Sequence, residues 1–301
     1  MNFGRDKLTW NQDIWNRIDQ AVHDEAMRTK IAAKFIPLYM TASDALTVPS
    51  DTILTSDPQT LTVGEGATFS LFEISVGFSL TQQQVENEGG LMTAVTLATR
   101  ATNSLSQAED ISIFQGDNGI KNNPLFASKR VRRRNSSFGK GLVQAAEDQR
   151  HSTPSHVIPV PLNPDAPAPN GYGENTFAKV AEAYSTLQSL GHYGPYALVL
   201  HTDVYADTYA PLKTTLIMPA DRIKPLVTAG FYGTGTLPAF RGLFMSLGGN
   251  SMDLAVGVDA TTAFLQEDTD RLDQFNVFER FTLRLKDKTA IIMLEFEPQI
   301  P

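Results

Sequence analysis

The sequence contains no cysteine among its 301 residues. This absence excludes disulfide cross-links, zinc sites built from thiolates and a cysteine nucleophile. Basic residues are also in the minority, because 25 lysines and arginines stand against 33 aspartates and glutamates, for a formal net charge of -8. Such a surface is poorly suited to binding nucleic acid or an anionic membrane. We therefore expect neither of them as a partner.

Long apolar runs are missing as well. Ala290–Leu294 is one of the longest, and spanning a bilayer takes roughly 20 apolar residues. The N-terminal segment Met1–Arg17 is polar, contains both tryptophans and lacks the apolar core of a signal peptide. Hydrophobic residues nevertheless make up 42% of the chain, which excludes global disorder. We expect a soluble, cytoplasmic protein.

Helical spacing is clearest in two segments of the N-terminal half. Apolar residues three and four positions apart predict a first helix that begins near Asn11 and ends before Pro37. A second, longer helix is predicted over Met92–Phe114, where small residues along one side suit close packing. The polar, glycine-containing run Gln115–Gly119 predicts the end of this helix.

A turn-rich stretch between these helices leads into a strand. Strict alternation over Phe72–Leu80 places apolar side chains on one face and polar ones on the other, as in a half-buried strand. Shorter β-like pieces precede it at Asp51–Thr55 and Thr60–Val63. Together they predict a protruding β-ribbon. Because two strands are marginally stable alone, the ribbon needs a surface to lie on, such as another copy of the chain.

The middle of the chain interrupts this pattern. Residues 122–174 contain the basic run Lys129–Arg134, a short helical pattern at Leu142–Gln149 and a proline-rich tract, which together indicate an insertion or surface excursion. We interpret the basic run as a solvated loop, with an acidic partner or nucleic acid as the alternative. The later segments give an α+β order without βαβ alternation. Strands are expected at Tyr196–Leu200, Gly242–Leu247, Met252–Val258, Val277–Lys286 and Thr289–Glu297.

No constellation of catalytic or metal-binding residues is apparent in the sequence. The glycine-rich segment Gly230–Gly235 lacks the strand-to-helix setting of a phosphate loop. The neighbouring carboxylates Glu109 and Asp110 would point about 100° apart on a helix, which suits capping or ion pairing better than acid–base catalysis. We therefore predict no catalytic residue, no metal site and no cofactor. The histidines form no spaced ligand set; they are His23, His151, His156, His192 and His201.

Several segments occur in the order found in one known family. They are individually weak but together span nearly the whole chain. The segments are Gly4–Asp6 with Trp15–Asp19, Val76–Thr81, Gln107–Gly116, Gly194–Leu200, Met252–Val256 and Phe281–Leu285. On these residues the chain resembles the encapsulins, bacterial shell proteins that share the tailed-phage major capsid fold of the Hong Kong 97 type.

The resemblance implies a division of the α+β chain into known parts. These are an N-terminal helical arm (1–40), an extended loop (41–75), a peripheral domain (76–121 and 243–301), an insertion (122–174) and an axial domain (175–242). The extended loop would lie on a neighbouring subunit. The chain would have no enzymatic activity of its own. It would assemble in sixty copies, or a multiple, into an icosahedral nanocompartment around a cargo enzyme of the peroxidase or ferritin-like class.

The resemblance also implies two functional surfaces. A cargo protein's targeting peptide would bind in an apolar groove on the lumenal face. Many relatives carry an arginine and an aspartate where this chain has Ala33 and Pro37, so a peptide that is more apolar or otherwise different is expected. The alternative is that these groove residues are core contacts only. The groove residues would be Val22, Ala26, Met27, Ile31, Phe35, Leu254 and Val256. A loop lining the five-fold pore would consist of Lys213, Thr214, Thr215, Leu216, Ile217, Met218 and Pro219.

Two other functions stay open at this point. A phage or prophage major capsid protein that packages DNA would have the same fold, but the net negative charge and the family-like N-terminal helix argue against it. An enzyme in its own right is the second alternative, and no nucleophile–base pair or metal set in the sequence supports it.

Overall fold

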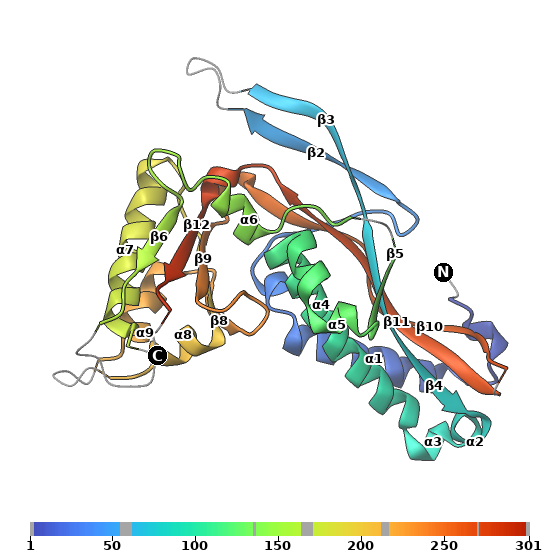
Figure 1. Cartoon of the computed structure of the whole chain (residues 1–301). Coiled ribbons are helices and arrows are strands. Elements are labelled where there is room, and N and C mark those ends of the chain that lie inside the picture. The colour runs from blue at the N-terminus through green and yellow to red at the C-terminus, as the bar shows by residue number, and fades with distance from the viewer. Residues whose placement is uncertain are drawn as a thin grey trace.

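The computed structural model describes residues 3–54, 62–134, 137–163, 171–211, 217–269 and 271–298. Figure 1 shows an elongated molecule with helices and sheets at both ends and a two-stranded ribbon projecting from it. Within the described residues, three sheets organise these parts: two of five strands and one of two strands.

The first sheet holds the strands in the order β1-β10-β11-β4-β5. Its centre is an antiparallel pair of long strands, in which Met252 of β10 lies opposite Leu285 of β11. The short edge strand β1 runs parallel to β10, and the other edge strand, β5, runs antiparallel to β4. The strands are β1 (Leu38–Met40), β4 (Phe72–Thr81), β5 (Val131–Arg134), β10 (Met252–Glu267) and β11 (Leu272–Leu285).

Two helices cover one face of the first sheet. Helix α1 (Gln12–Thr29) begins at Asn11, whose side-chain oxygen accepts a hydrogen bond from the Ile14 N–H, and α4 (Thr93–Asn122) packs beside it. The predicted first helix therefore exists, but it ends at Thr29. The buried Asp110 carboxylate of α4 accepts hydrogen bonds from the next free N–H groups, those of Ile31 and Ala32, so the chain turns away there.

The predicted end of the second helix is a break instead. Gly116 leaves the helical conformation at φ 61°, and helix α4 then continues to Asn122. A side chain at Gly116 would collide with the backbone of Gly139 and Gly141, so both the positive φ and the close approach require glycine. The segment 137–141 thus passes directly against helix α4.

The second sheet is buried on both of its faces. Its strands lie in the order β6-β12-β9-β7-β8. Alternate side chains, such as Val199 and Leu198, enter two different cores, one shared with the first sheet and one beneath helix α7. Covering on both faces explains the continuous apolar runs of these strands. The elements are β6 (Val157–Val160), α7 (Gly173–Ser189), β7 (Tyr196–His201), α8 (Thr202–Asp207), α9 (Pro219–Ile223), β8 (Gly230–Thr234), β9 (Arg241–Ser246) and β12 (Ile291–Phe296).

The sheets cut across two boundaries expected from the sequence. Strands β9 and β12, from the range assigned to the peripheral domain, pair with β7 and β6 in the second sheet. Strands β5 and β6, from the range assigned to an insertion, extend the first and second sheets respectively. The range 122–174 is thus partly built into the sheets. The shorter helices are α2 (Gln82–Glu86), α3 (Glu88–Leu91), α5 (Pro124–Ala127) and α6 (Leu142–Glu147).

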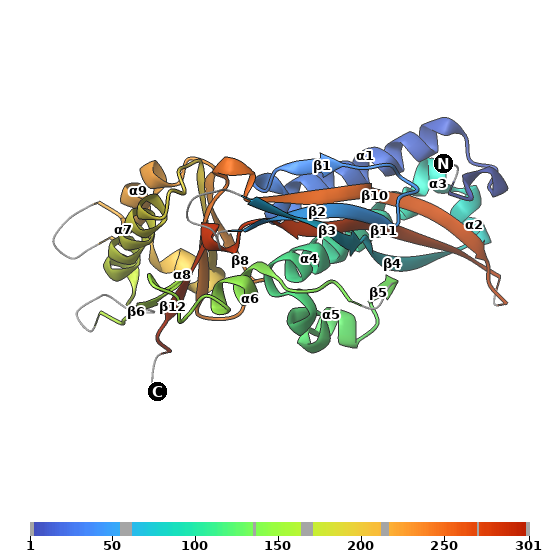
Figure 2. The same cartoon turned by 90° about the horizontal axis from the view of Figure 1, so that it is seen from above.

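The third sheet is the projecting ribbon. Strands β2 (Thr47–Leu54) and β3 (Thr62–Ser70) pair antiparallel and are longer than the pieces predicted for them. The root of the ribbon is fixed by Val48 and Leu71, which are buried against Ala255 of β10. Because Leu254 and Val256 face the helices, Ala255 points to the opposite, helix-free face of the first sheet. The ribbon therefore leaves the molecule from the helix-free face (Figures 1 and 2).

Candidate functional site

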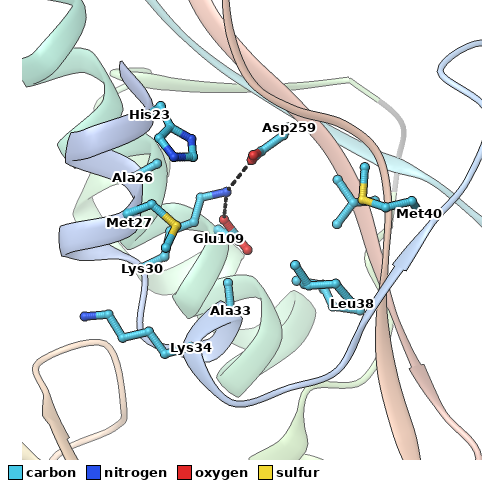
Figure 3. A pocket seen from close by; sticks show the side chains of 12 residues that line it. His23, Ala26, Met27, Lys30, Ala33, Lys34, Leu38, Met40, Glu109 and Asp259 are labelled. Carbon is cyan, nitrogen blue, oxygen red and sulfur yellow. Dashed lines mark hydrogen bonds and ion pairs between the residues drawn. The ribbon is translucent and has the colours of Figure 1, made fainter. Parts of the chain in front are cut away.

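A groove opens where helix α1 meets the edge strand β1. It encloses about 290 Å³ between α1, α4, β1 and β10, and Figure 3 shows its side chains converging from these elements. In the part of the chain that the structure describes, no helix is long and apolar enough to cross a membrane. The lining residues are His23, Ala26, Met27, Lys30, Ala33, Lys34, Leu38, Met40, Glu109, Leu254, Val256 and Asp259.

The walls of the groove are unusually exposed for apolar residues. Met27 on α1 is 64% exposed, and Leu38 and Met40 on β1 are 55% and 65% exposed. The parallel register places Leu38 beside Leu254 and Met40 beside Val256, so four apolar side chains share one face of the sheet. Exposed apolar clusters of this kind mark interaction surfaces, and Met adapts its shape to different ligands.

The floor of the groove holds a cluster of charges, in which Lys30, Glu109 and Glu279 are buried and Asp259 is 61% exposed. The Lys30 Nζ lies 2.6 Å from the carboxylates of Glu109 and Glu279 and 3.2 Å from that of Asp259. Figure 3 shows the lysine reaching from the end of α1 toward Glu109 and Asp259. Lys30 joins α1 to α4, β10 and β11, because these three acidic residues come from three different elements.

Burial and mutual charge set the protonation of this cluster. Burial lowers the pKa of Lys30, but its three carboxylate neighbours outweigh that effect and hold the pKa well above its usual value. Burial raises the pKa of Glu279, and the charge of Glu109 raises it further. Burial also raises the pKa of Asp110 to about 8, although the N–H groups of Ala32 and Ile31 oppose the shift. Lys30 therefore stays protonated, whereas the raised pKa values of the carboxyl groups leave fewer negative charges than the number of acidic residues suggests.

The structure separates the predicted groove residues into two groups. Ala26, Met27, Leu254 and Val256 line the groove. Val22 is 1% exposed and lies in the main core, and Phe35 is also buried there, with its ring 5.6 Å from that of Tyr232. Ile31 is half-buried against the same core. Val22, Ile31 and Phe35 therefore match the alternative interpretation, in which these residues are core contacts.

Several lining residues were not expected from the sequence. Leu38 and Met40 form the outer wall, and Lys30, Lys34 and Asp259 supply charge. The apolar run directly after Pro37 was a weak signal for them, but the parallel pairing of β1 with β10 joins segments more than two hundred residues apart. Ala33 also lines the groove, and the charged side chains there are Lys30, Lys34, Glu109 and Asp259.

The described part of the predicted pore loop, Ile217–Pro219, lies at the other end of the molecule. Lys213, Thr214, Thr215 and Leu216 lie outside the described residues. Ile217 is 57% exposed, Met218 precedes helix α9, and Pro219 is buried at the first position of that helix. Figure 2 shows α9 far from α1, so this loop and the groove are separate surfaces.

The basic run Lys129–Arg134 is a solvated loop, as expected, only at Lys129 and Arg130. Its second part is the edge strand β5, paired with β4 through Val131–Val76 and Arg134–Glu73. Val131 is buried, whereas Arg132, Arg133 and Arg134 are exposed. The buried valine anchors the strand against α4. The run of charged residues around it gave no sign of this strand in the sequence. Among the described residues, no group of three or more His, Asp or Glu side chains is arranged to hold a metal ion.

Comparison with solved structures assigns the class of the fold. The chain matches the virus-like particle of Pyrococcus furiosus with a TM-score of 0.67 over 93% of this chain and 99% of that one, at 15% identity. It matches the holo-SrpI encapsulin complex of Synechococcus elongatus with a TM-score of 0.53 over 89% and 90% of the two chains, at 8% identity. The fold is that of the Hong Kong 97 type capsid proteins, as predicted.

Sequence comparison then places the chain beside a particular group within this class. Residues 157–282 match the family described as encapsulating protein for peroxidase. The type 1 encapsulin shell protein EncA of Myxococcus xanthus is 27% identical over 94% of this chain and 93% of its own length. The diheme-cytochrome-encapsulin shell fusion protein of Kuenenia stuttgartiensis is 25% identical over 96% of this chain and 74% of its own length. The resemblance to the encapsulin shell proteins is confirmed.

Proposed function

We propose that this chain is the structural subunit of a closed icosahedral shell that encloses a cargo enzyme. The observation that carries the proposal is the combination of a capsid fold with a β-ribbon that projects beyond its own chain's two main sheets. A ribbon with one anchored end gains stability only by lying on another surface, and sixty equivalent copies provide one. The match to encapsulin shell proteins along most of the chain supports a cargo enzyme over a packaged genome.

We further propose that the groove between α1 and β1 binds the targeting peptide of the cargo. Met27, Leu38 and Met40 offer exposed apolar surface, each side chain worth roughly 1.5–3 kcal/mol when buried. Such a short contact is weak alone, and many copies facing one lumen compensate through multivalency. The native cargo is expected to be a peroxidase or a ferritin-like redox enzyme, and the shell to assemble in the cytoplasm. The domain division and the five-fold pore loop given above stay parts of this proposal.

The first experiment is the particle mass of the chain expressed alone. Light scattering with negative-stain imaging should give a discrete hollow particle of sixty copies of the 33.0 kDa chain, roughly 2 MDa, or of a multiple of that mass. The ratio of absorbance at 260 and 280 nm should be that of protein alone. A particle filled with nucleic acid would favour a viral capsid, and a monomer or small oligomer would overturn the shell proposal.

The second experiment tests the groove. The shell is co-expressed with the protein encoded beside its gene, and the amount of that protein inside purified particles is measured. Met27→Asp should reduce loading about tenfold or more, because it places a charge in the apolar contact. Leu91→Asp is the matched control, since Leu91 is 60% exposed on α3 outside the groove. Equal loading in both variants would contradict docking at this groove.

A further inference from the structure

The chain crosses from the first sheet to the second through a short link. This link, residues 286–290, lies between the end of β11 and the start of β12. Two histidines from other parts of the chain bind Thr289 within it. They are His156, directly before β6, and His192, which follows helix α7. Both rings therefore contact the segment that joins the two sheets.

The contacts determine which nitrogen of each ring carries a proton. The Thr289 hydroxyl donates to the Asp287 carboxylate at 2.6 Å, so its oxygen accepts from the His192 Nε2, 2.7 Å away. The Thr289 carbonyl oxygen lies 3.2 Å from the His156 Nε2 and can only accept. Each neutral ring therefore carries its proton on Nε2, and Nδ1 is the atom that takes up a second proton in acid.

The Nδ1 atom of His156 has a hydrogen-bond partner in either protonation state. It lies 2.9 Å from the Ser152 Oγ, which is 2.6 Å from the Gln149 carbonyl oxygen and 2.8 Å from that of Pro154. Because a hydroxyl both donates and accepts, Ser152 can donate to the neutral ring and accept from the charged one. Protonation therefore breaks none of the ring's hydrogen bonds, and its cost is electrostatic.

Burial and neighbouring charge differ between the two rings. His156 is 2% exposed, whereas the His192 side chain is 14% exposed and its Nε2 lies 3.8 Å from the Asp287 carboxylate. Among the described residues, no other carboxylate forms an ion pair with either ring. One carboxylate neutralises one imidazolium, so in acid His192 is charged first. His156 must then take up its proton inside the protein, beside a second cation.

The direction of the pKa shift agrees with this geometry. Burial lowers the pKa of His156, and the charge of His192 lowers it further. The carbonyl groups of Thr289 and Pro154 and the carboxylate of Asp287 oppose the shift without reversing it. A histidine whose pKa is lowered in the folded chain binds its proton more readily once the structure around it opens. Its contribution to stability is therefore lost as the pH falls below about 6.5, the usual pKa of histidine.

The other charged groups on the elements around His156 do not alter this balance. Within the described residues they are either exposed or paired with each other, and none of them forms an ion pair with the two rings. They are Lys140 with Asp148, Arg150 with Glu147 and Glu295, Arg241 with Glu295, Lys179 with Glu182, Arg222 with Glu174, Lys286 with Asp253, and the exposed His151 and Lys288.

Movement of the link would disturb both cores of the molecule. The fully buried Ile291 and Ile292 follow it directly, one in the core shared by the two sheets and the other in the core beneath α7. The Met293 N–H donates to the His156 carbonyl oxygen at 2.8 Å, where β6 begins to pair with β12. A charge on His156 therefore acts at the place where the second sheet is attached to the first.

We propose that His156 and His192 make this link acid-sensitive: the neutral rings hold Thr289 near neutral pH, and in acid the two charged rings release the link and open the shell. The inference rests on the proposed shell function, because a closed particle requires the two sheets of every copy to keep one relative position.

The test is the fraction of chain in closed particles as a function of pH, measured by light scattering. Wild-type particles should open as the pH falls below about 6. His156→Gln does not titrate, and its amide can still donate to Thr289, so it should lower the midpoint of opening by about one pH unit. His151→Gln is the matched control, because His151 is an exposed histidine in the turn before His156. It should open like the wild type.

Three outcomes would overturn the proposal. The first is a wild-type particle that stays closed down to about pH 4.5. The second is a midpoint for His156→Gln equal to that of the wild type, and the third is an equal shift in His151→Gln. Asp110 cannot cause opening in acid, because its pKa is raised to about 8 and its protonation in acid favours the folded chain.

A second variant keeps the test decisive if circular dichroism shows that His156→Gln is unfolded. His192→Gln removes the cation beside His156 and should lower the midpoint by a smaller amount. Its amide can still donate to the Thr289 hydroxyl oxygen. An unchanged midpoint in a folded His192→Gln chain contradicts the proposal.

Failure of the shell and failure of the link can be told apart. A wild-type chain that forms no particle at neutral pH overturns the shell proposal, and amide hydrogen exchange then tests the link within the chain itself. After correction for the intrinsic effect of pH, the Met293 N–H should lose protection between about pH 7.5 and 5.5 in the wild type but not in His156→Gln. Equal protection at both pH values overturns the acid sensitivity of the link.

Discussion

The two edge strands of the first sheet expose side chains of opposite character, apolar on one and charged on the other. At one edge, β1 exposes Leu38, Tyr39 and Met40, and at the other, β5 exposes a row of arginines. An open sheet edge attracts unwanted strands, and natural proteins protect it with charge or with very short strands. Strand β5 uses charge, whereas β1 is only three residues long. The comparison of the two edges shows that exposed apolar side chains occur at β1, where helix α1 forms the other wall of a groove.

The largest expected effect comes from the floor of the groove. Lys30→Met removes the cation that faces Glu109 and Glu279, both almost fully buried. Removing one partner of a buried ion pair typically lowers the free energy of unfolding by about 3–5 kcal/mol, and chemical denaturation will measure it. Adding Glu109→Gln to the same chain should recover part of the loss. A loss below about 1 kcal/mol would mean that water reaches the cluster and stabilises the carboxylates instead.

Substitutions at two leucines that are paired in register test the floor and the wall of the groove separately. Leu254 is 1% exposed and its register partner Leu38 is 55% exposed. Leu254→Ala should therefore cost about 2–5 kcal/mol of unfolding free energy, through lost burial and the cavity left behind. Leu38→Ala should cost less than about 1 kcal/mol but reduce cargo loading. Similar costs for both substitutions would show that β1 is covered in the folded chain.

The pH dependence of stability should also originate beside the groove. The pKa of Asp110 is raised from its usual 3.8 to about 8, so between these values the folded chain holds a proton that the unfolded chain has released. Stability therefore falls as the pH rises from about 4 to 8, by at most about 1.4 kcal/mol per pH unit for one group. Asp110→Asn should flatten this slope in urea unfolding measured across that range. An unchanged slope would assign the dependence to Glu279, whose pKa is raised as well.

The smallest effect is expected at the arginine edge. Arg134 is 81% exposed and 3.8 Å from Glu73, so Arg134→Gln should change the unfolding free energy of the chain by less than about 0.5 kcal/mol. Arg280→Gln is the comparison, because Arg280 binds the same carboxylate at 2.8 Å and is only 20% exposed. It should cost more, up to about 1 kcal/mol. A larger loss for Arg134→Gln would make this edge part of the fold and not a free surface.

Much of the fold was predictable where local periodicity and burial agree. The alternation of Phe72–Leu80 gave β4 almost residue for residue, and the apolar spacing gave α1 its N-terminus and buried face. The end of α1 was missed because Asp110, distant in sequence, binds the N–H groups of Ile31 and Ala32. Strand β5 was missed because three of its four side chains are exposed arginines, and pairing with β4 rather than residue type makes it a strand.

The groove was predictable only in part, for a related reason. Met27, Ala26, Leu254 and Val256 followed from the resemblance, but that likeness did not distinguish them from Val22 and Phe35, which the packing turns into the core. Position along a helix gives a side chain's direction, and neighbouring elements decide whether that direction ends in a core or in a groove.

The sequence by itself showed a cysteine-free, acidic chain with an α+β order of elements, a β-ribbon and a series of segments similar to those of the encapsulin shell proteins. Those properties are local or cumulative, so they can be read along the chain. Only the tertiary structure decided that Lys30 meets three carboxylates from three elements, that β1 lies beside β10, and that the arginines of β5 stand on two faces of one sheet edge. These features depend on contacts between distant segments, and burial and register are properties of those contacts.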